Sequence, residues 1–218
     1  MTLPPTNIEQ PLGTFWLMSL ASSAALEIAP HVPANFKQVG AEEARALAQA
    51  MGNTETTEVL RRFSTGRRCY VAMVGNVLAT YGWVSMEEEA IGELHLHIRL
   101  ARGEAYIWDC ATLPAYRGQR LYPALLTYIV KQLRSEGLSR IWIGADSDNY
   151  ASQSGMALAG FRPIADIVDT CVLALRRPWL RGRPGVPESL VTDMRRMVYG
   201  DRAFAWQEAV SHMSQKQG

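Results

Sequence analysis

A strand-like segment, a short loop and a helical segment follow one another near the middle of the chain. Residues 105–112 form an apolar run that ends just before Pro114. Residues 121–135 then repeat leucine and isoleucine at helical spacing. Backbone N–H groups at a helix start have no intrahelical acceptor, and the positive end of the helix dipole adds to their attraction for anions. The segment therefore predicts a strand–loop–helix unit that binds a phosphate group.

The periodicity of the chain changes around this unit. Alternating apolar residues at 69–74, 77–85 and 91–100 are typical of antiparallel strands, whereas later strands alternate with helices. Hairpins followed by such alternation predict an α/β (α+β) fold, with a mixed sheet and helices on its faces. The pattern leaves open whether 78–85 and 91–100 are separate strands or one bent strand, and we interpret the acidic residues 87–89 as a solvated loop. The other predicted elements are a strand at 36–39, helices at 41–52 and 54–63, a strand at 140–145, a helix at 149–159, a strand region at 161–175 and helical segments from 188.

Composition and charge narrow the class of protein. The 218 residues are 48% hydrophobic with a net charge of +1, which is typical of one soluble globular domain. We therefore expect neither a nucleic-acid nor a membrane partner. The arginine clusters at 61–68 and 176–183 are interpreted as solvated loops, with a docking surface for a phosphate-bearing ligand as the alternative. The cysteines Cys69, Cys110 and Cys171 lie in apolar runs without metal-ligand spacing, so we expect reduced thiols, no metal site and a cytoplasmic location.

Residues 14–30 are a weakly charged apolar segment near the N-terminus. They contain one charge, Glu27, and are short for a membrane span, which needs about 20 residues. No lysine or arginine precedes them, unlike the start of a secretory signal. The segment predicts an N-terminal strand and loop packed on the domain, with a signal or membrane anchor as the alternative.

Two motifs resemble the GNAT superfamily of acyl-CoA-dependent N-acetyltransferases. The stretch ATLPAYRGQRLYPALL is similar to the family's pyrophosphate loop, Arg/Gln-x-x-Gly-x-Gly/Ala, and residues 149–161 are similar to its helix that begins with Asn and ends in Gly-Phe. The resemblance implies a GNAT-like mixed, mostly antiparallel central sheet flanked by helices and splayed at the strands near 105–112 and 140–145. The domains it implies are an N-terminal arm or strand packed on the domain (1–35), a GNAT-like N-acetyltransferase domain (36–178) and a C-terminal helical extension (179–218).

The resemblance also implies acetyl-CoA as the co-substrate and a site for it. Loop and helix N–H groups would hold the pyrophosphate, and the end of the 105–112 strand would pair with the pantetheine amides like an added strand. Arg120 and Tyr122 depart from the family pattern because they stand where it has glycine or alanine, so Tyr122 must point away or narrow the groove. Met156 stands where many members have a tyrosine that protonates the departing thiolate. The cofactor-binding candidates are Cys110, Ala111, Thr112, Arg117, Gly118, Gln119, Arg120, Leu121, Tyr122, Asn149 and Ser152.

A base is needed to take the proton from an amine acceptor. Asp109 is the leading candidate because it is a carboxylate inside an otherwise apolar strand. The alternative is a strand carboxylate that faces solvent or pairs with an arginine. Glu104 is the second catalytic candidate, although a glutamate near a turn is more often solvated. Glu93, His95 and His97 share one face of a predicted strand. This polar face would line the acceptor groove; metal binding is a less favoured alternative.

These observations predict an N-acetyltransferase. It would move an acetyl group from acetyl-CoA to a primary amine of a small molecule or peptide, by direct attack in a ternary complex. Cys110 has no adjacent histidine to activate it, so we expect no covalent acyl-enzyme. The departures at Arg120, Tyr122 and Met156 motivate an alternative, an acyl-CoA-binding regulatory module with little or no transferase activity. A scaffold that binds no CoA is a third hypothesis, and a homodimer is a possible assembly.

Overall fold

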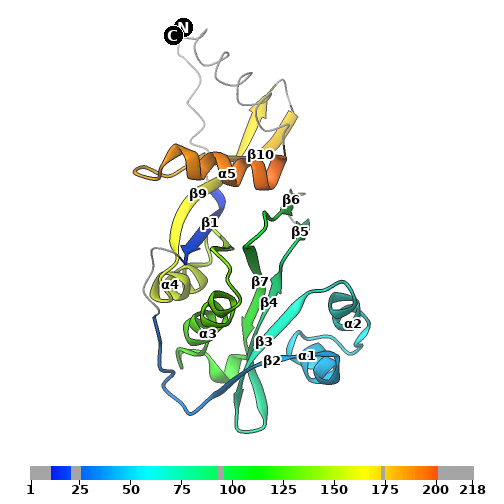
Figure 1. The fold of residues 1–218 in the computed structure, drawn as a ribbon. Coiled ribbons are helices and arrows are strands. Elements are labelled where there is room, and N and C mark those ends of the chain that lie inside the picture. Colours follow the sequence, from blue (N-terminus) through cyan, green and yellow to red (C-terminus); the bar gives the residue numbers. More distant parts are fainter. Residues whose placement is uncertain (1–10, 21–25, 93–95, 173–174, 201–218) are drawn as a thin grey trace, which may run out of the picture.

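A computed structural model describes residues 11–20, 26–92, 96–172 and 175–200. An eight-stranded sheet with the order β10-β9-β1-β8-β7-β4-β3-β2 runs through the molecule (Figure 1). Its β7–β8 pair is parallel and its other described pairs are antiparallel. The sheet strands are β1 (Pro11–Ser19), β2 (Asn35–Val39), β3 (Arg68–Val74), β4 (Val77–Ser85), β7 (Glu104–Thr112), β8 (Arg140–Asp146), β9 (Arg162–Val172) and β10 (Leu175–Gly182); β5 (Glu88–Ile91) and β6 (Leu96–Arg99) form a separate hairpin.

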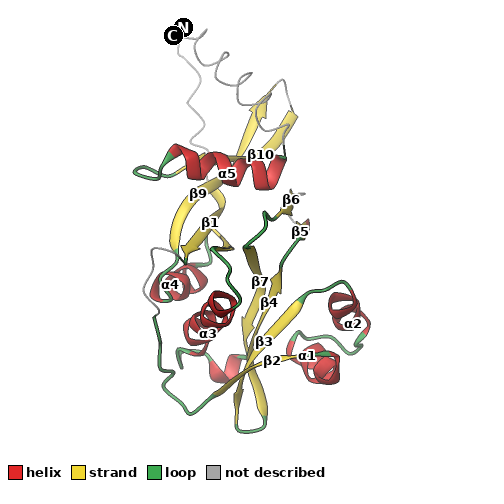
Figure 2. Cartoon of the chain, in the orientation of Figure 1, coloured by secondary structure: helices red, strands yellow, loops and turns green. Residues whose placement is uncertain are grey.

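Helices cover both faces of this sheet, so the predicted fold class is confirmed (Figure 2). On one face, α3 and α4 pack in a core that includes Trp16 and Ile107. On the other face, α1 and α2 cover β3 and β4, while α5 and the β5–β6 hairpin pack over the half that contains β1, β9 and β10. The helices are α1 (Ala44–Ala50), α2 (Thr57–Ser64), α3 (Leu121–Ser135), α4 (Tyr150–Leu158) and α5 (Glu188–Tyr199).

The two parallel strands separate halfway along their length. They pair only from Glu104 opposite Arg140 to Ile107 opposite Ile143, and no later pair joins them within the described chain. On the other side of β7 the register skips, so that Asp109 and Cys110 lie opposite one residue of β4, Gly82. Such a bulge increases the local bend and twist of a strand. The splay implied by the resemblance is therefore present, with a bulge at the point where β7 leaves β8.

The strand predicted within residues 14–30 is present as β1. It lies between β8 and β9 and buries four consecutive apolar side chains, from Phe15 to Met18. Consecutive strand residues alternate between faces, so β1 contributes to the cores on both sides of the sheet. Within the described residues, no helix is long and apolar enough to cross a membrane.

Two expectations about the chain between β4 and β7 are settled. The prediction of a solvated loop at 87–89 is wrong, because Glu88–Ile91 forms β5 and the side chain of Glu89 is buried. The segments 78–85 and 91–100 are not one bent strand, since Leu96–Arg99 forms β6 in the separate hairpin. The predicted domain boundary at residue 178 falls within β10. The three domain limits given above stay predictions.

Candidate functional site

A groove of about 570 Å³ follows the junction between β7, the loop after it and the starts of α3 and α4. Every cofactor-binding candidate named from the sequence lines this groove, from Cys110 on β7 to Ser152 on α4. The lining comes from three separate segments, which the splay of β7 and β8 brings together. The structure therefore gathers both sequence motifs around one space.

The loop before α3 adopts left-handed backbone conformations at two positions. Gly118 has a φ of 77°, and Arg120, the N-cap residue of α3, has a φ of 57° and a ψ of 19°. Arg120 therefore holds a conformation that glycine adopts freely, and this conformation costs about 1–2 kcal/mol for a residue with a side chain. The resemblance implies a glycine at this position. No side chain caps α3 within the described chain, so its first N–H groups are left for an anion. The Arg117 guanidinium donates to the carbonyl oxygen of Thr112 (3.2 Å) and so ties the loop to the end of β7.

Asn149 caps the second helix of the groove. Its side-chain oxygen accepts a hydrogen bond from the backbone N–H of Ser152 (3.0 Å). Removing such a cap typically costs about 1 kcal/mol. Asn149 therefore fixes the start of α4 at the place where the resemblance expects it to hold the cofactor.

Tyr122 points from the first turn of α3 toward α4 and narrows the groove. A Cβ atom at Gly155 would lie only 2.5 Å from Cδ1 of this ring, so the glycine leaves the space that the ring fills. The Tyr122 hydroxyl lies 3.4 Å from the Ser152 hydroxyl, and burial raises the pKa of the phenol, which keeps its proton. Met156 is 1% exposed and packs in the core, away from the groove lining.

A second cavity of about 290 Å³ opens beside the first, between the splayed ends of β7 and β8. Its walls come from β1, β5, β7, β8 and β9, together with the starts of α3 and α4. The two cavities share four lining residues, which we call the junction: Cys110, Tyr122, Asn149 and Ser152. The two cavities therefore adjoin each other at the junction.

The sequence was also compared with models of known protein families. The model of the Acetyltransferase (GNAT) family matches residues 41–161, more than half of the chain. The chain belongs to the GNAT acetyltransferase family. The family and the enzyme class predicted from the sequence, an acyltransferase, are therefore confirmed. The family uses acetyl-CoA as its co-substrate. None of the curated proteins matches the chain.

Solved structures of GNAT proteins are similar to this chain. A GNAT-family acetyltransferase from Colwellia psychrerythraea has a TM-score of 0.54 at 19% identity, over 73% of this chain and 55% of its own. A putative GNAT acetyltransferase from Novosphingobium aromaticivorans has 16% identity and a TM-score of 0.48, over 75% and 65%. A tandem GNAT protein from the clavulanic acid pathway has 20% identity and a TM-score of 0.49, over 72% and 52%. The chain thus spans about half to two thirds of these proteins.

Asp109 lies at the bulge of β7 and lines the second cavity of the GNAT protein. Its carboxylate forms an ion pair with Arg62 of α2, which is the arginine pairing considered as the alternative to a free base. The Arg62 guanidinium also pairs with Glu58 and lies 4.5 Å from the centre of the Trp108 ring. These contacts fix Asp109 in place beside the junction.

Glu104 lies at the opposite end of β7 from the junction. It is 7% exposed, pairs with Arg140 (3.3 Å) and lines neither cavity. The structure therefore does not bring this second catalytic candidate to the site. Of the predicted polar face, Glu93 and His95 lie outside the described residues, and His97 is exposed beside Glu88 (3.7 Å).

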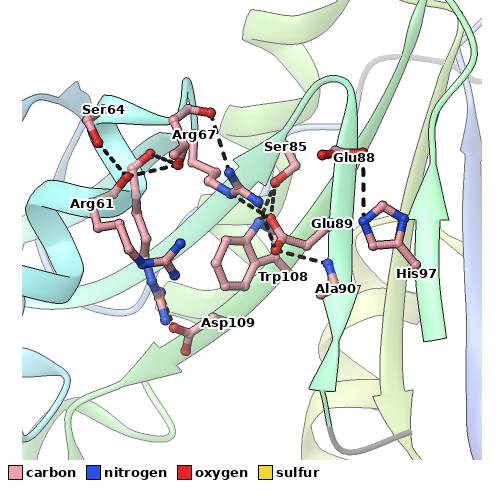
Figure 3. Close-up of polar contacts among 12 residues, drawn as sticks. Arg61, Ser64, Arg67, Ser85, Glu88, Glu89, Ala90, His97, Trp108 and Asp109 are labelled. Carbon is pink, nitrogen blue, oxygen red and sulfur yellow. Dashed lines mark hydrogen bonds and ion pairs between the residues drawn. The ribbon is translucent and has the colours of Figure 1, made fainter. Parts of the chain in front are cut away.

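A network next to the second cavity was not foreseen from the sequence. Glu89 pairs with Arg67 (3.0 Å) and accepts a hydrogen bond from Ser85, whose hydroxyl in turn accepts one from the indole N–H of Trp108 (2.9 Å; Figure 3). The network holds the Trp108 ring, which lines the cavity. Arg61, Arg62, Arg67 and Arg68 each pair with a carboxylate. The interpretation as solvated side chains is wrong for Arg62 and Arg67, which are 11% and 19% exposed, whereas the Arg61 side chain is 59% exposed.

Proposed function

We propose that the protein is an N-acetyltransferase that moves the acetyl group of acetyl-CoA to a primary amine by direct attack in a ternary complex. The observation that carries the proposal is the pair of cavities that meet at the junction. One cavity includes the uncapped start of α3, and the other includes the carboxylate of Asp109. Holding two reactants in contact can supply several kcal/mol of the required rate acceleration.

The cofactor would lie in the larger groove. Its pyrophosphate would accept hydrogen bonds from the first N–H groups of α3, and Arg117 and Arg120 add positive charge at the same end. Its pantetheine arm would pair with the edge of β7 that β8 leaves open after Ile107. A backbone N–H at this edge would also stabilise the negative oxygen that forms on the thioester carbonyl.

Two side chains are assigned to proton transfer. Asp109, directly or through water, takes the proton from the attacking nitrogen. As the C–N bond forms and the C–S bond breaks, the Tyr122 hydroxyl gives its proton to the sulfur of coenzyme A and regains one from solvent. Tyr122 lines both cavities and keeps its proton, whereas Met156 has no proton to donate.

The same geometry argues against a covalent acyl-enzyme. Burial and the neighbouring Asp109 raise the pKa of the Cys110 thiol, so it stays protonated and a weak nucleophile. Cys69 and Cys110 are free thiols, which suits the reducing cytoplasm that we propose as the location.

The test combines cofactor binding with thiol release. Acetyl-CoA should raise the melting temperature, because a ligand at 100 times its Kd adds about 2.7 kcal/mol of stability. Amine-dependent release of free coenzyme A should then appear with a panel of primary amines. Tight binding of acetyl-CoA without release to any amine would refute the transferase and favour the regulatory module.

Single substitutions test the proton-transfer roles. Tyr122→Phe should lower kcat by about 10² to 10⁴, the usual contribution of a general acid, and leave the acetyl-CoA thermal shift intact. Tyr116→Phe is the matched control, since Tyr116 lines the larger groove but not the second cavity. Asp109→Asn should lower kcat with cofactor binding preserved, in protein shown by circular dichroism to be folded. Equal kcat in Tyr122→Phe and the control would remove Tyr122 from the mechanism.

A further inference from the structure

Tyr122 has the only large side chain at the junction. The other three junction residues, Cys110, Asn149 and Ser152, have smaller side chains. Asn149 is held by its capping bond from the N–H of Ser152 (3.0 Å). The Cys110 sulfur donates to the carbonyl oxygen of Trp108 (3.6 Å). The width of the junction is therefore set mainly by the Tyr122 ring.

The Tyr122 ring is held between α3 and α4. Gly155 of α4 lies against one side of the ring, where even a Cβ atom would come within 2.5 Å and 2.7 Å of two ring carbons. The ring also packs against the core that includes buried Met156, and its hydroxyl lies 3.4 Å from that of Ser152. Close-packed neighbours of this kind resist displacement. Tyr122 is therefore a fixed wall of the groove rather than a side chain that yields to a ligand.

The acyl group of the donor would meet this wall if the cofactor binds as proposed. Its sulfur would enter from the larger groove, its carbonyl oxygen would face a backbone N–H of β7, and the amine would attack from the second cavity. The remaining group on the planar carbonyl carbon is the acyl chain, which points away from both sulfur and oxygen. It would therefore point toward the side of the junction formed by the starts of α3 and α4, where Tyr122 and Ser152 lie.

We propose that the Tyr122 ring closes the end of the acyl site and limits the donor to a short acyl group, acetyl in preference to longer chains. This inference rests on the proposed cofactor site and adds the residue that selects the acyl length. Each added methylene would press against a ring without room to retreat, and overpacking of a filled space is unfavourable. The family pattern has glycine or alanine at this position, so the limit would come from this chain's own residue.

The test measures the binding of acyl-CoAs of increasing chain length in the absence of an amine. The probes are acetyl-CoA, butyryl-CoA and hexanoyl-CoA, and isothermal titration calorimetry gives the Kd of each. In the wild type, hexanoyl-CoA should bind at least about 30-fold more weakly than acetyl-CoA, because a well-filled pocket discriminates by about 10–200-fold for a single methylene. Butyryl-CoA should fall between them.

Substitutions at Tyr122 separate the ring from its hydroxyl. Tyr122→Ala should reduce the ratio of the hexanoyl-CoA Kd to the acetyl-CoA Kd by at least about tenfold, because the chain can enter the space of the ring and each buried methylene strengthens binding by about fourfold. Tyr122→Phe keeps the ring and should leave this ratio unchanged although it lowers kcat. If Tyr122→Ala does not fold, Tyr122→Leu should give a smaller reduction in the same direction.

Tyr116→Ala is the matched control, because it removes a ring that lines the larger groove but not the second cavity, and it should leave the ratio unchanged. Equal Kd values for acetyl-CoA and hexanoyl-CoA in the wild type would overturn the inference and leave the transferase standing, as would an unchanged ratio in the folded Tyr122→Ala or Tyr122→Leu variant. A limit on chain length without transfer to any amine would refute the transferase and leave Tyr122 as the wall of an acyl-CoA site. If no acyl-CoA binds, both proposals are overturned.

Discussion

The contact between Tyr122 and Gly155 predicts a substitution whose effect changes sign with its background. Glycine inside a helix is normally less stable than alanine by about 0.5–1 kcal/mol, so Gly155→Ala should stabilise α4 if the helix alone decided the outcome. The new Cβ would instead lie 2.5 Å and 2.7 Å from two carbons of the Tyr122 ring. Overpacking of this kind costs about 1–3 kcal/mol. Gly155→Ala should therefore be neutral to destabilising in the wild type, by up to about 2 kcal/mol.

Removal of the ring should restore the intrinsic preference of the helix. In a Tyr122→Ala background, Gly155→Ala should stabilise the protein by about 0.5–1 kcal/mol, which corresponds to a coupling energy of about 1–3 kcal/mol between the two sites. Urea denaturation of the wild type, both single variants and the double variant measures this coupling directly. Ala157→Gly, at an exposed position of the same helix, is the control and should cost the same in both backgrounds. Equal stabilisation by Gly155→Ala with and without the ring would refute the close contact.

Three further predictions follow from the charged and thiol groups around β7. Arg62→Met should lower the free energy of unfolding by about 2 kcal/mol or more, because it leaves the half-buried Asp109 unpaired and removes two ring contacts; a loss below about 0.5 kcal/mol in urea denaturation would contradict this. Arg61 and Arg62 lower the pKa of Glu58 to about 2, so its stabilisation is present above pH 4.5 and is lost as pH falls toward 2. Glu58→Gln should reduce the change in unfolding free energy between pH 4.5 and pH 2 by less than about 1 kcal/mol, because the group is exposed to solvent. If the unfolding free energies of Glu58→Gln and the wild type change in parallel with pH, the coupling is disproved. Cys110→Ala should retain acetyl transfer, with no burst of coenzyme A and no acetylated enzyme by intact mass; abolished transfer with retained folding would point to a covalent step.

The parts of the fold that the sequence predicts well are those set by local interactions. The helix predicted at 121–135 coincides with α3, since apolar spacing and the terminal glycine at 137 act within a few residues. The helix predicted at 149–159 is α4, and the bond from the Ser152 N–H to its N-cap residue, Asn149, spans only three positions. The cofactor candidates come from two short motifs, and each motif forms a helix start through interactions between residues close in sequence.

The parts that were missed depend on partners far away in the sequence. Three consecutive glutamates suggest a solvated loop, but Arg67, 22 positions earlier, allows Glu89 to be buried in β5. The pairing of Asp109 with Arg62 likewise joins residues 47 positions apart. The left-handed conformation of Arg120 could not be predicted for another reason. A glycine in a loop indicates that a positive φ is possible, whereas an arginine gives no such indication.

The position of β1 has a consequence for how the molecule is assembled. The strand lies between β8 and β9, and the Thr14 side chain donates a hydrogen bond to Asp166, which is 152 positions later in the chain. During synthesis, β1 therefore leaves the ribosome long before either of its neighbours exists. Its apolar side chains and open edges stay unpartnered until most of the chain has been made. The sheet therefore cannot form one strand at a time in chain order. The β9–β10 pair joins the rest of the sheet only when β1 is placed between β8 and β9.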